Sequence, residues 1–370
     1  MEYRIIQKQK EAMKKVGYDA LISMSPENAT YTAGVAIPSH SIVRQRHVIC
    51  VVPANGAPKM IVVNMEESFA RANAQIKDIR AYNEFTESPI QFLSDAVKEM
   101  GLERSRIGIE VDYLPARDYE KLRGLLPHTR FEDVESFFGK LRMIKTDEEI
   151  EKLRKVGKAA ERVHHKAFGS LKPGMTELDL AGLIVTGLYA EGVDQILKIV
   201  VGAGERCSHA NPGPTKNIVK QGDMIRVDIF ATLSSYLSDV ARTAVVGRPT
   251  DFQRETWKKL IEARAATLDA IKPGVHSQEV YQIFSKKFKD LGLEPINFVG
   301  HGLGLTLHED PYINRFSDTI LEPGMVLCVE PYYMLVEQNM GFQIEDEIIV
   351  TEKGYELITD YKDSSELIQV

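Results

Sequence analysis

Hydrophobic and polar positions follow two different periods along this chain, that of an amphipathic helix and that of a buried strand. Residues 3–17 have the helical spacing, and so does a segment near residues 88–101. Short apolar runs typical of strands lie at residues 18–25, 46–53, 58–64 and 106–112. This alternation of helices and strands predicts an α/β fold for the first part of the chain.

A charged helix follows this first part. Thr146 and Glu149 have the spacing of a capping box, and the helical pattern continues to about residue 168. We interpret its many charges as a solvent-exposed face with pairs four residues apart, and His164 as an ordinary helix residue rather than part of a functional site.

The second part of the chain contains an internal repeat. Residues 171–192 and 271–292 align without a gap, and each consists of a Pro-Gly turn followed by an amphipathic helix that ends in glycine. Each copy precedes a glycine-containing stretch that ends in His-x-x-Pro, so that His209 and His308 are counterparts. The repeat predicts two similar halves related by a pseudo-two-fold axis.

Acidic residues recur at matched places in these halves. Each half continues with a strand-like run that ends in a carboxylate six residues after a glycine, Asp228 in one half and Glu330 in the other. A second strand then carries another carboxylate, Asp239 or Glu345. The two halves therefore supply four acids in corresponding positions.

An ionised carboxylate in a buried strand needs a cation, a basic partner or a proton. Arg226 or Arg242 could be the basic partner of any single one of the four acids. If the halves pack face to face, however, four converging acids require a strong positive centre, which two divalent ions supply. A carboxylate-rich set with one imidazole suits Mn²⁺, Co²⁺ or Zn²⁺ better than Ca²⁺ or Mg²⁺.

Composition narrows the class of protein. A chain of 370 residues favours two domains, which we place at residues 1–140 and 141–370. The net charge of -7 argues against a nucleic-acid partner, and no apolar run approaches the length of a membrane span or a signal peptide. Three widely spaced cysteines, Cys50, Cys207 and Cys328, indicate reduced thiols and a cytoplasmic protein.

Several motifs together resemble one superfamily. The segments "VDIF…YLSDVART", "GHGLGLTLHEDP", "VLCVEPYY" and "GFQIEDEIIVTEKG" resemble the successive motifs of the pita-bread metallohydrolases, which include methionine aminopeptidase, Xaa-Pro aminopeptidase, prolidase and creatinase. The segment "YDALISMSPENATYTAGV" is similar to the start of a creatinase-type N-terminal domain. The resemblance covers essentially the whole chain. It implies a creatinase-like α/β domain followed by a pita-bread domain, an α/β (α+β) fold overall.

The resemblance also implies a set of metal ligands. Asp228 and Asp239 would bind one ion, Asp239 and Glu345 would bridge the two ions, and His301 and Glu330 would complete the second site. His301, and not its neighbour seven residues later, is then the histidine ligand.

Catalytic roles follow from the same resemblance. His209 and His308 would hold the substrate carbonyl and stabilise the tetrahedral intermediate. A hydroxide shared by the two ions would be the nucleophile, with Glu330 as the proton shuttle to the leaving amine. Thr243 would help to position the metal-bound groups. The simpler interpretation of His209 is a hydrogen-bonded loop histidine.

Three departures from the family pattern concern the substrate pocket. Phe230 stands where Xaa-Pro peptidases usually have glycine, Gln343 replaces their usual arginine, and residues 330–333 read Glu-Pro-Tyr-Tyr rather than Glu-Pro-Gly-x-Tyr. The shape of the pocket is therefore expected to differ from that of its relatives.

Three functions agree with this sequence. The first is an Xaa-Pro dipeptidase or aminopeptidase acting on short peptides, and the second is a non-peptidase metalloenzyme that hydrolyses a small amide or cleaves a small zwitterion. A catalytically silent binding protein is the third. Arg44, Arg46 or Arg315 could meet a substrate carboxylate, although each is also explained as a surface residue. The resemblance implies a homodimer.

Overall fold

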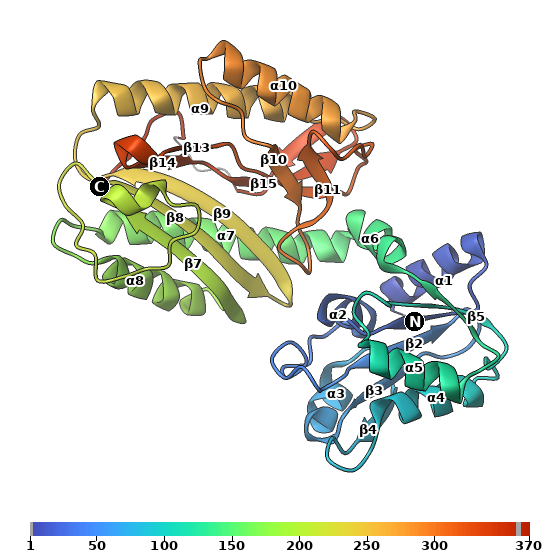
Figure 1. Ribbon diagram of the computed structural model, residues 1–370. Helices are drawn as coiled ribbons and strands as arrows, with labels where there is room; N and C mark the ends of the chain where they lie inside the picture. The colour runs from blue at the N-terminus through green and yellow to red at the C-terminus, as the bar shows by residue number, and fades with distance from the viewer. Residues whose placement is uncertain (1–2, 360–363) are drawn as a thin grey trace. The chain divides into compact units, whose positions relative to one another are not determined.

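The protein forms two compact units. The computed structural model describes residues 3–359 and 364–370, and one unit ends at Arg142 while the other begins at Met143 (Figure 1). This division falls within helix α6 (Glu135–Met143), the helix that also contains residues 140 and 141.

The first unit is built on a six-stranded sheet in the order β4-β3-β2-β1-β5-β6. Strand β2 runs antiparallel to both of its neighbours, and the remaining pairs are parallel. The helices and strands predicted here are confirmed, with small shifts at their ends. The elements are α1 (Arg4–Val16), β1 (Ala20–Ser23), α2 (Pro26–Ala33), β2 (Ile49–Pro53), β3 (Lys59–Val63), η1 (Asn64–Glu66), α3 (Glu67–Asn73), β4 (Asp78–Tyr82), α4 (Pro89–Glu99), β5 (Arg106–Ile109), α5 (Ala116–Leu125) and β6 (Arg130–Asp133).

The second unit contains two pairs of helices that correspond to the internal repeat. Thr146 caps the first helix and forms a capping box with Glu149, as the sequence predicts. The second helices of the two pairs, α8 and α10, begin one hundred residues apart. The helices are α7 (Asp147–Ser170), α8 (Glu177–Ala190), α9 (Asp251–Ala270) and α10 (Ser277–Asp290).

The turns around α8 and α10 repeat as well. Gly174 and Gly274 precede the two helices with φ of 92° and 87°, a backbone conformation that favours glycine. Isolated bridges then join Thr176 to Ile218 in one half and His276 to Ile320 in the other. The repeat in the sequence is therefore a repeat of backbone structure.

Each half of the second unit also contributes a sheet. The first has the order β17-β9-β8-β7, the second has the order β11-β10-β12-β15-β16, and β13 pairs with β14. The elements are β7 (Gln195–Ala203), η2 (Gly204–Ser208), β8 (Met224–Leu233), β9 (Tyr236–Val245), β10 (Phe298–Gly302), β11 (Glu309–Asn314), β12 (Val326–Val329), β13 (Tyr332–Leu335), η3 (Val336–Gln338), β14 (Met340–Gln343), β15 (Asp346–Thr351), β16 (Gly354–Leu357) and β17 (Ile368–Gln369).

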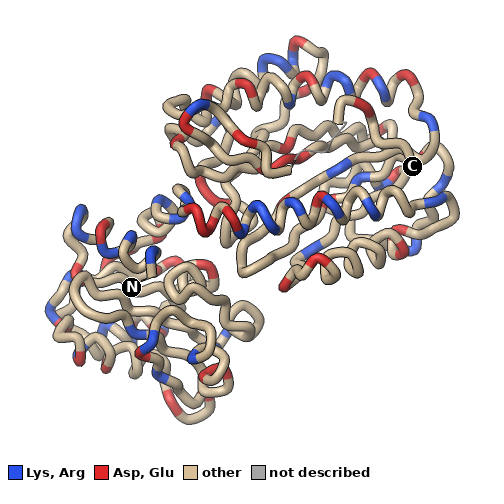
Figure 2. The backbone as a smooth tube through the Cα atoms, turned by 180° about the vertical axis from the view of Figure 1, so that it is seen from behind, with Lys and Arg blue, Asp and Glu red and all other residues tan. Residues whose placement is uncertain are grey.

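Helices cover the outer faces of these two sheets (Figure 1). Helices α7 and α8 pack on the β7–β9 sheet around an apolar core that includes Ile184 and Val227, and α9 and α10 pack on the second sheet around Trp257 and Phe284. Acidic and basic residues follow one another along α7 (Figure 2). Among the described residues, no helix is both long and apolar enough to cross a membrane.

Candidate metal centre

The acids that the repeat predicts lie on the faces of the two sheets that point away from the helices. In β8, Ile225, Val227 and Ile229 belong to the core beneath α7 and α8. Side chains alternate across a strand, so Asp228 lies on the opposite, inner face. Asp239 of β9 lies on the same inner face, because it pairs with the residue two positions after Asp228.

The second sheet presents its own polar residues by the same alternation. Leu327 and Val329 of β12 belong to the core beneath α9 and α10. Glu330 comes directly after β12, one position beyond Val329, so its side chain points to the face opposite the helices. His301 of β10 pairs directly with Cys328 of β12. Each sheet therefore has one apolar face for its helices and one polar face for a site.

These residues meet in a buried cluster. His301 Nε2 lies 3.2 Å from Glu330 Oε1 and 3.6 Å from Asp239 Oδ2. One oxygen or nitrogen atom each of Asp239, His301 and Glu345 lies within 4.8 Å of the others, together with the sulfur of Cys328. The five predicted ligands are all buried, with exposed fractions of 0–7%.

Burial and mutual repulsion act on the acids of the cluster. Burial, and then the neighbouring Glu330, raises the pKa of Asp228 to about 6, although Arg226 opposes the shift. Burial and the surrounding carboxylates raise the pKa of Asp239 and Glu345 well above the ordinary range. Ionising these acids together at neutral pH therefore requires a positive centre among them.

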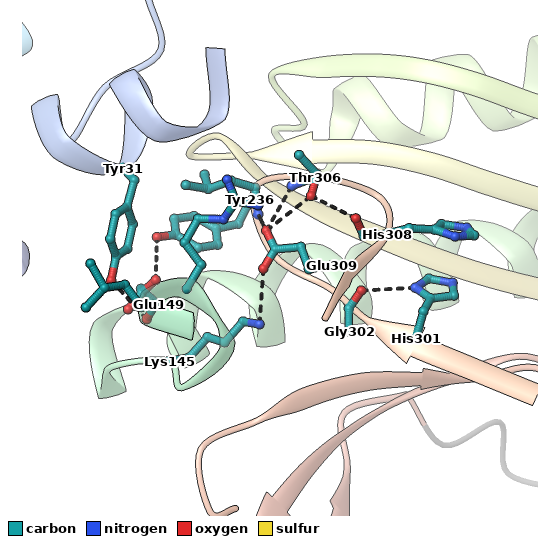
Figure 3. Close-up of polar contacts among 12 residues, drawn as sticks. Tyr31, Lys145, Glu149, Tyr236, His301, Gly302, Thr306, His308 and Glu309 are labelled. Atoms are coloured by element: carbon teal, nitrogen blue, oxygen red, sulfur yellow. Dashed lines mark hydrogen bonds and ion pairs between the residues drawn. The ribbon is translucent and has the colours of Figure 1, made fainter. Parts of the chain in front are cut away.

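The orientation of His301 leaves a lone pair directed at these acids. Its Nδ1 lies 3.0 Å from the backbone carbonyl oxygen of Gly302, an acceptor that assigns the ring proton to Nδ1 (Figure 3). Nε2 is then a bare acceptor facing carboxylate oxygens. Histidines that bind a metal through one ring nitrogen commonly donate a hydrogen bond from the other, which fixes the tautomer in this way.

The donor set fits divalent metal ions. Several buried side-chain atoms of the cluster have no hydrogen-bond partner, and every one of them is a possible ligand atom. No lysine or arginine in residues 3–359 or 364–370 forms an ion pair with any of the four acids, so pairing with Arg226 or Arg242 does not account for them. The partnerless atoms are Asp228 Oδ1, Asp239 Oδ1, His301 Nε2, Glu345 Oε1 and Glu345 Oε2.

The arginines near the cluster bind other groups instead. Arg226 donates to Gln343 Oε1 at 2.6 Å and to the backbone carbonyls of His209 and Ala210. The Nε2 atom of Gln343 lies 3.4 Å from Asp228 Oδ2, so that the glutamine links the arginine to a predicted ligand. The sequence identified Gln343 as unusual but did not reveal this link.

Thr243 holds Gln343 in place. Its hydroxyl donates to the Gln343 carbonyl at 2.8 Å and accepts the Gln343 backbone N–H at 2.9 Å. This contact gives a structural basis for the positioning role that we predict for Thr243.

A further layer of polar residues lies behind the predicted ligands. Arg242 and Arg264 both bind the buried carboxylate of Asp346, at 2.7 and 2.5 Å. Glu347 accepts the backbone N–H of Asp239 at 2.9 Å. Glu347 was not among the residues predicted from the sequence, although in an extended segment a residue two positions after Glu345 lies on the same face.

A short loop places His308 beside His301. The two rings stack with their centroids 3.8 Å apart and their planes at 14°. Glu309 fixes the loop, because its carboxylate accepts the backbone N–H groups of Leu305 and Thr306 and lies 3.4 Å from Lys145 Nζ (Figure 3). Burial, and then His301, lowers the pKa of His308 to about 4.

A cavity of about 440 Å³ opens onto the cluster. Asp228, Asp239, Glu330 and His308 line it, and so do Phe230, Tyr332 and Gln343, which all depart from the family pattern. Further lining residues are Leu197, Lys198, Ala210, Asn211, Arg226, Phe298, Leu307 and Met334.

His209 and the three candidate arginines lie outside this lining. The side chain of His209 is exposed, and its two successors, Ala210 and Asn211, line the cavity instead. Arg46 pairs with Glu84 at 2.8 Å, and Arg44 lines a separate cavity of the first unit. The guanidinium of Arg315 lies over the ring of Phe316. The arrangement favours surface roles for Arg46 and Arg315.

Comparison with known proteins identifies the family. Residues 151–352 match the model of metallopeptidase family M24, and residues 5–144 match that of the creatinase/prolidase N-terminal domain. The chain belongs to metallopeptidase family M24. The expected pita-bread fold, the creatinase-type N-terminal domain and the metallopeptidase class are thereby confirmed.

Individual members of the M24 family are similar over nearly the whole chain. An Xaa-Pro dipeptidase of Lactobacillus helveticus is 31% identical over 90% of this chain and 91% of its own length. The crystal structure of dipeptidase PepE from Mycobacterium ulcerans superposes with a TM-score of 0.84 at 27% identity, covering 99% of this chain and 97% of that one. The X-Pro aminopeptidase from Thermotoga maritima MSB8 shares the fold, with a TM-score of 0.86 at 23% identity and 99% coverage of both chains.

Proposed function

We propose that this M24 protein is a dinuclear metal-dependent Xaa-Pro dipeptidase or aminopeptidase that cleaves the amide bond of short proline-containing peptides. The observation that carries the proposal is the cluster of buried, partnerless ligand atoms beside a 440 Å³ cavity. The Xaa-Pro dipeptidase of Lactobacillus helveticus, similar over 90% of this chain, supports the choice of substrate.

Five residues would hold two ions, which we propose to be Mn²⁺, Co²⁺ or Zn²⁺. Asp228, Asp239 and Glu345 supply carboxylates, and His301 and Glu330 complete the set. When bound, such ions supply Lewis acidity toward the scissile carbonyl and lower the pKa of water enough to give a nucleophilic hydroxide at neutral pH.

The remaining polar residues would handle the substrate and its protons. Glu330 lines the cavity, where its carboxylate would accept a proton from the attacking water and pass it to the nitrogen of the leaving amine. His308 is uncharged at neutral pH, because its pKa is about 4, and its ring would donate a hydrogen bond to the developing oxyanion. We retain His209 as a second such donor, since its neighbours Ala210 and Asn211 line the cavity.

A substrate panel tests this proposal. Xaa-Pro dipeptides, tripeptides of the form Xaa-Pro-Xaa and small cyclic or zwitterionic amides would be incubated with protein loaded with Mn²⁺, Co²⁺ or Zn²⁺, and with chelated protein as the control. We expect release of the N-terminal residue from an Xaa-Pro substrate only in the metal-loaded samples.

The panel also separates the second candidate function. Phe230 lines the cavity where the family usually has glycine, and its larger side chain favours a smaller substrate. Cleavage of a small amide or zwitterion, with every peptide left intact by protein that holds its metal, would establish the non-peptidase enzyme instead.

Two properties of the whole protein complete the proposal. We propose a cytoplasmic location, supported by three buried free cysteines, and a homodimer, as the family resemblance implies. Size-exclusion chromatography with light scattering measures the second property directly.

A further inference from the structure

One row of side chains crosses the first sheet from the predicted metal ligands to an exposed lysine. In the strand register, Asp239 of β9 pairs with Phe230 of β8, and Phe230 pairs with Lys198 of β7. Directly paired residues share a face of the sheet, and the same three side chains line the cavity. Lys198 therefore belongs to the wall that carries Asp228 and Asp239.

Lys198 differs from the other cation of the cavity. Arg226 is buried and donates to Gln343 and to two backbone carbonyls, so its orientation is fixed by the protein. The side chain of Lys198 is exposed, and no ion pair or side-chain hydrogen bond joins it to any residue in 3–359 or 364–370. It is a cation whose carboxylate partner the chain itself does not supply.

From these observations we propose that Lys198 binds the free carboxylate of the substrate, on the leaving side of the scissile bond. The proposal rests on the peptidase function above and specifies its substrate as a dipeptide with an uncapped C-terminus. A protonated amine at the same place would be repelled, so the lysine also sets the direction in which the peptide lies.

The distances in the sheet agree with a substrate of this length. Neighbouring strands lie about 4.8 Å apart, so the backbones at Lys198 and Asp239 are separated by roughly 10 Å. One residue beyond the scissile bond carries the carboxylate about 3.5 Å further, and the flexible lysine side chain covers the remaining distance. The intervening Phe230 offers an apolar surface to the ring or side chain of that residue.

A pair of matched substrates tests the proposal. The metal-loaded protein would be assayed with an Xaa-Pro dipeptide and with the same dipeptide as its C-terminal amide. For wild type we expect kcat/KM to be about 10–100-fold higher for the acid, the range of one hydrogen-bonded charge pair. Lys198→Met should lower kcat/KM for the acid by a similar factor, mainly through KM, and leave the amide nearly unchanged, while Lys198→Arg should restore most of the preference.

Lys258→Met is the control, because it makes the same change in charge at an exposed lysine of α9 that does not line the cavity. Metal content and thermal unfolding of each variant confirm an intact site. If Lys198→Met lowers kcat/KM equally for the acid and the amide, or lowers it for neither, the assignment of Lys198 is wrong although the peptidase function stands. If metal-loaded wild type cleaves neither substrate, the peptidase function fails, and this inference with it.

Discussion

His301 and His308 lie seven positions apart in one glycine-rich segment, and their surroundings give them different tasks. His301 is fully buried, with Nδ1 fixed by the Gly302 carbonyl and Nε2 facing the acids. His308 is exposed at the cavity, stacks on His301, and has a ring nitrogen within 4.8 Å of ligand atoms of His301 and Glu330. These surroundings favour His301 as a metal ligand and His308 as a contact for substrate, and both roles stay predictions.

We therefore predict that His301→Ala and His308→Ala have different effects. His301→Ala should abolish loading of at least one ion and reduce kcat to background. His308→Ala should retain both ions but lower kcat by about 100- to 1000-fold, the range for loss of one oxyanion donor. Metal content by mass spectrometry, measured beside the rate, distinguishes them, and equal loss of metal in both variants would contradict this division.

His164 gives a pH-dependent prediction at the same scale. Its ring is buried in α7 with Nε2 2.8 Å from the Val240 carbonyl, and burial, followed by Arg242, lowers its pKa to about 3. The unfolded chain takes up this proton near pH 6.5, so between these pH values the unfolded state binds more protons and stability falls as the pH falls.

Comparison with His164→Gln measures how much His164 contributes to the pH dependence of the free energy of unfolding. From pH 7 to pH 5, we expect wild type to lose about 2 kcal/mol more free energy of unfolding than His164→Gln, which has no group to titrate. Urea unfolding of both proteins in chelator measures the difference. Parallel pH profiles would show that His164 is protonated in the folded protein.

At the scale of elements, the periodicity of the sequence predicted most helices and strands, because burial imposes a period of two on strands and of 3.6 on helices. The capping box at Thr146 and the helices at residues 171–192 and 271–292 are confirmed for this reason. The link from Arg226 through Gln343 to Asp228 was not predictable, since it joins residues 117 positions apart and depends on how two strands pack.

Helix α7 contacts the surroundings of the predicted metal centre through Glu347, a residue that was not predicted from the sequence. Gly157 lies against Glu347, so closely that a Cβ atom at this glycine would be 2.3 Å from Glu347 Oε2. The other oxygen of Glu347 accepts the backbone N–H of Asp239. A change in the helix should therefore be transmitted to a predicted ligand.

Gly157→Ala tests this connection. We expect overpacking to lower stability by about 1–3 kcal/mol, and the displaced Glu347 to weaken metal binding several-fold. Gly169→Ala in the same helix is the control, because a Cβ atom there meets open space, and it should leave metal affinity unchanged. Isothermal titration of the chelated protein with Mn²⁺ measures the metal affinity of both variants. Identical affinities would contradict the connection.

At the scale of the whole molecule, the predicted metal centre depends on both halves of the internal repeat. Asp228 and Asp239 come from one sheet, and His301, Glu330 and Glu345 come from the other half of the repeat. The matched spacing of the acids in the sequence predicted that they converge. The structure brings Asp239, Glu330 and Glu345 close to His301, and Asp228 close to Asp239. Their individual roles toward metal, and that of His209, stay predictions.

If this cluster makes the M24 protein a metal-dependent peptidase, hydrolysis must depend on bound metal. Titration of the chelated protein with Mn²⁺, while hydrolysis of an Xaa-Pro dipeptide is followed, tests it most directly. We predict no hydrolysis without metal and a rate that rises until two ions are bound per chain. Hydrolysis that is undiminished without metal, or two bound ions with no hydrolysis of any Xaa-Pro peptide, would contradict it.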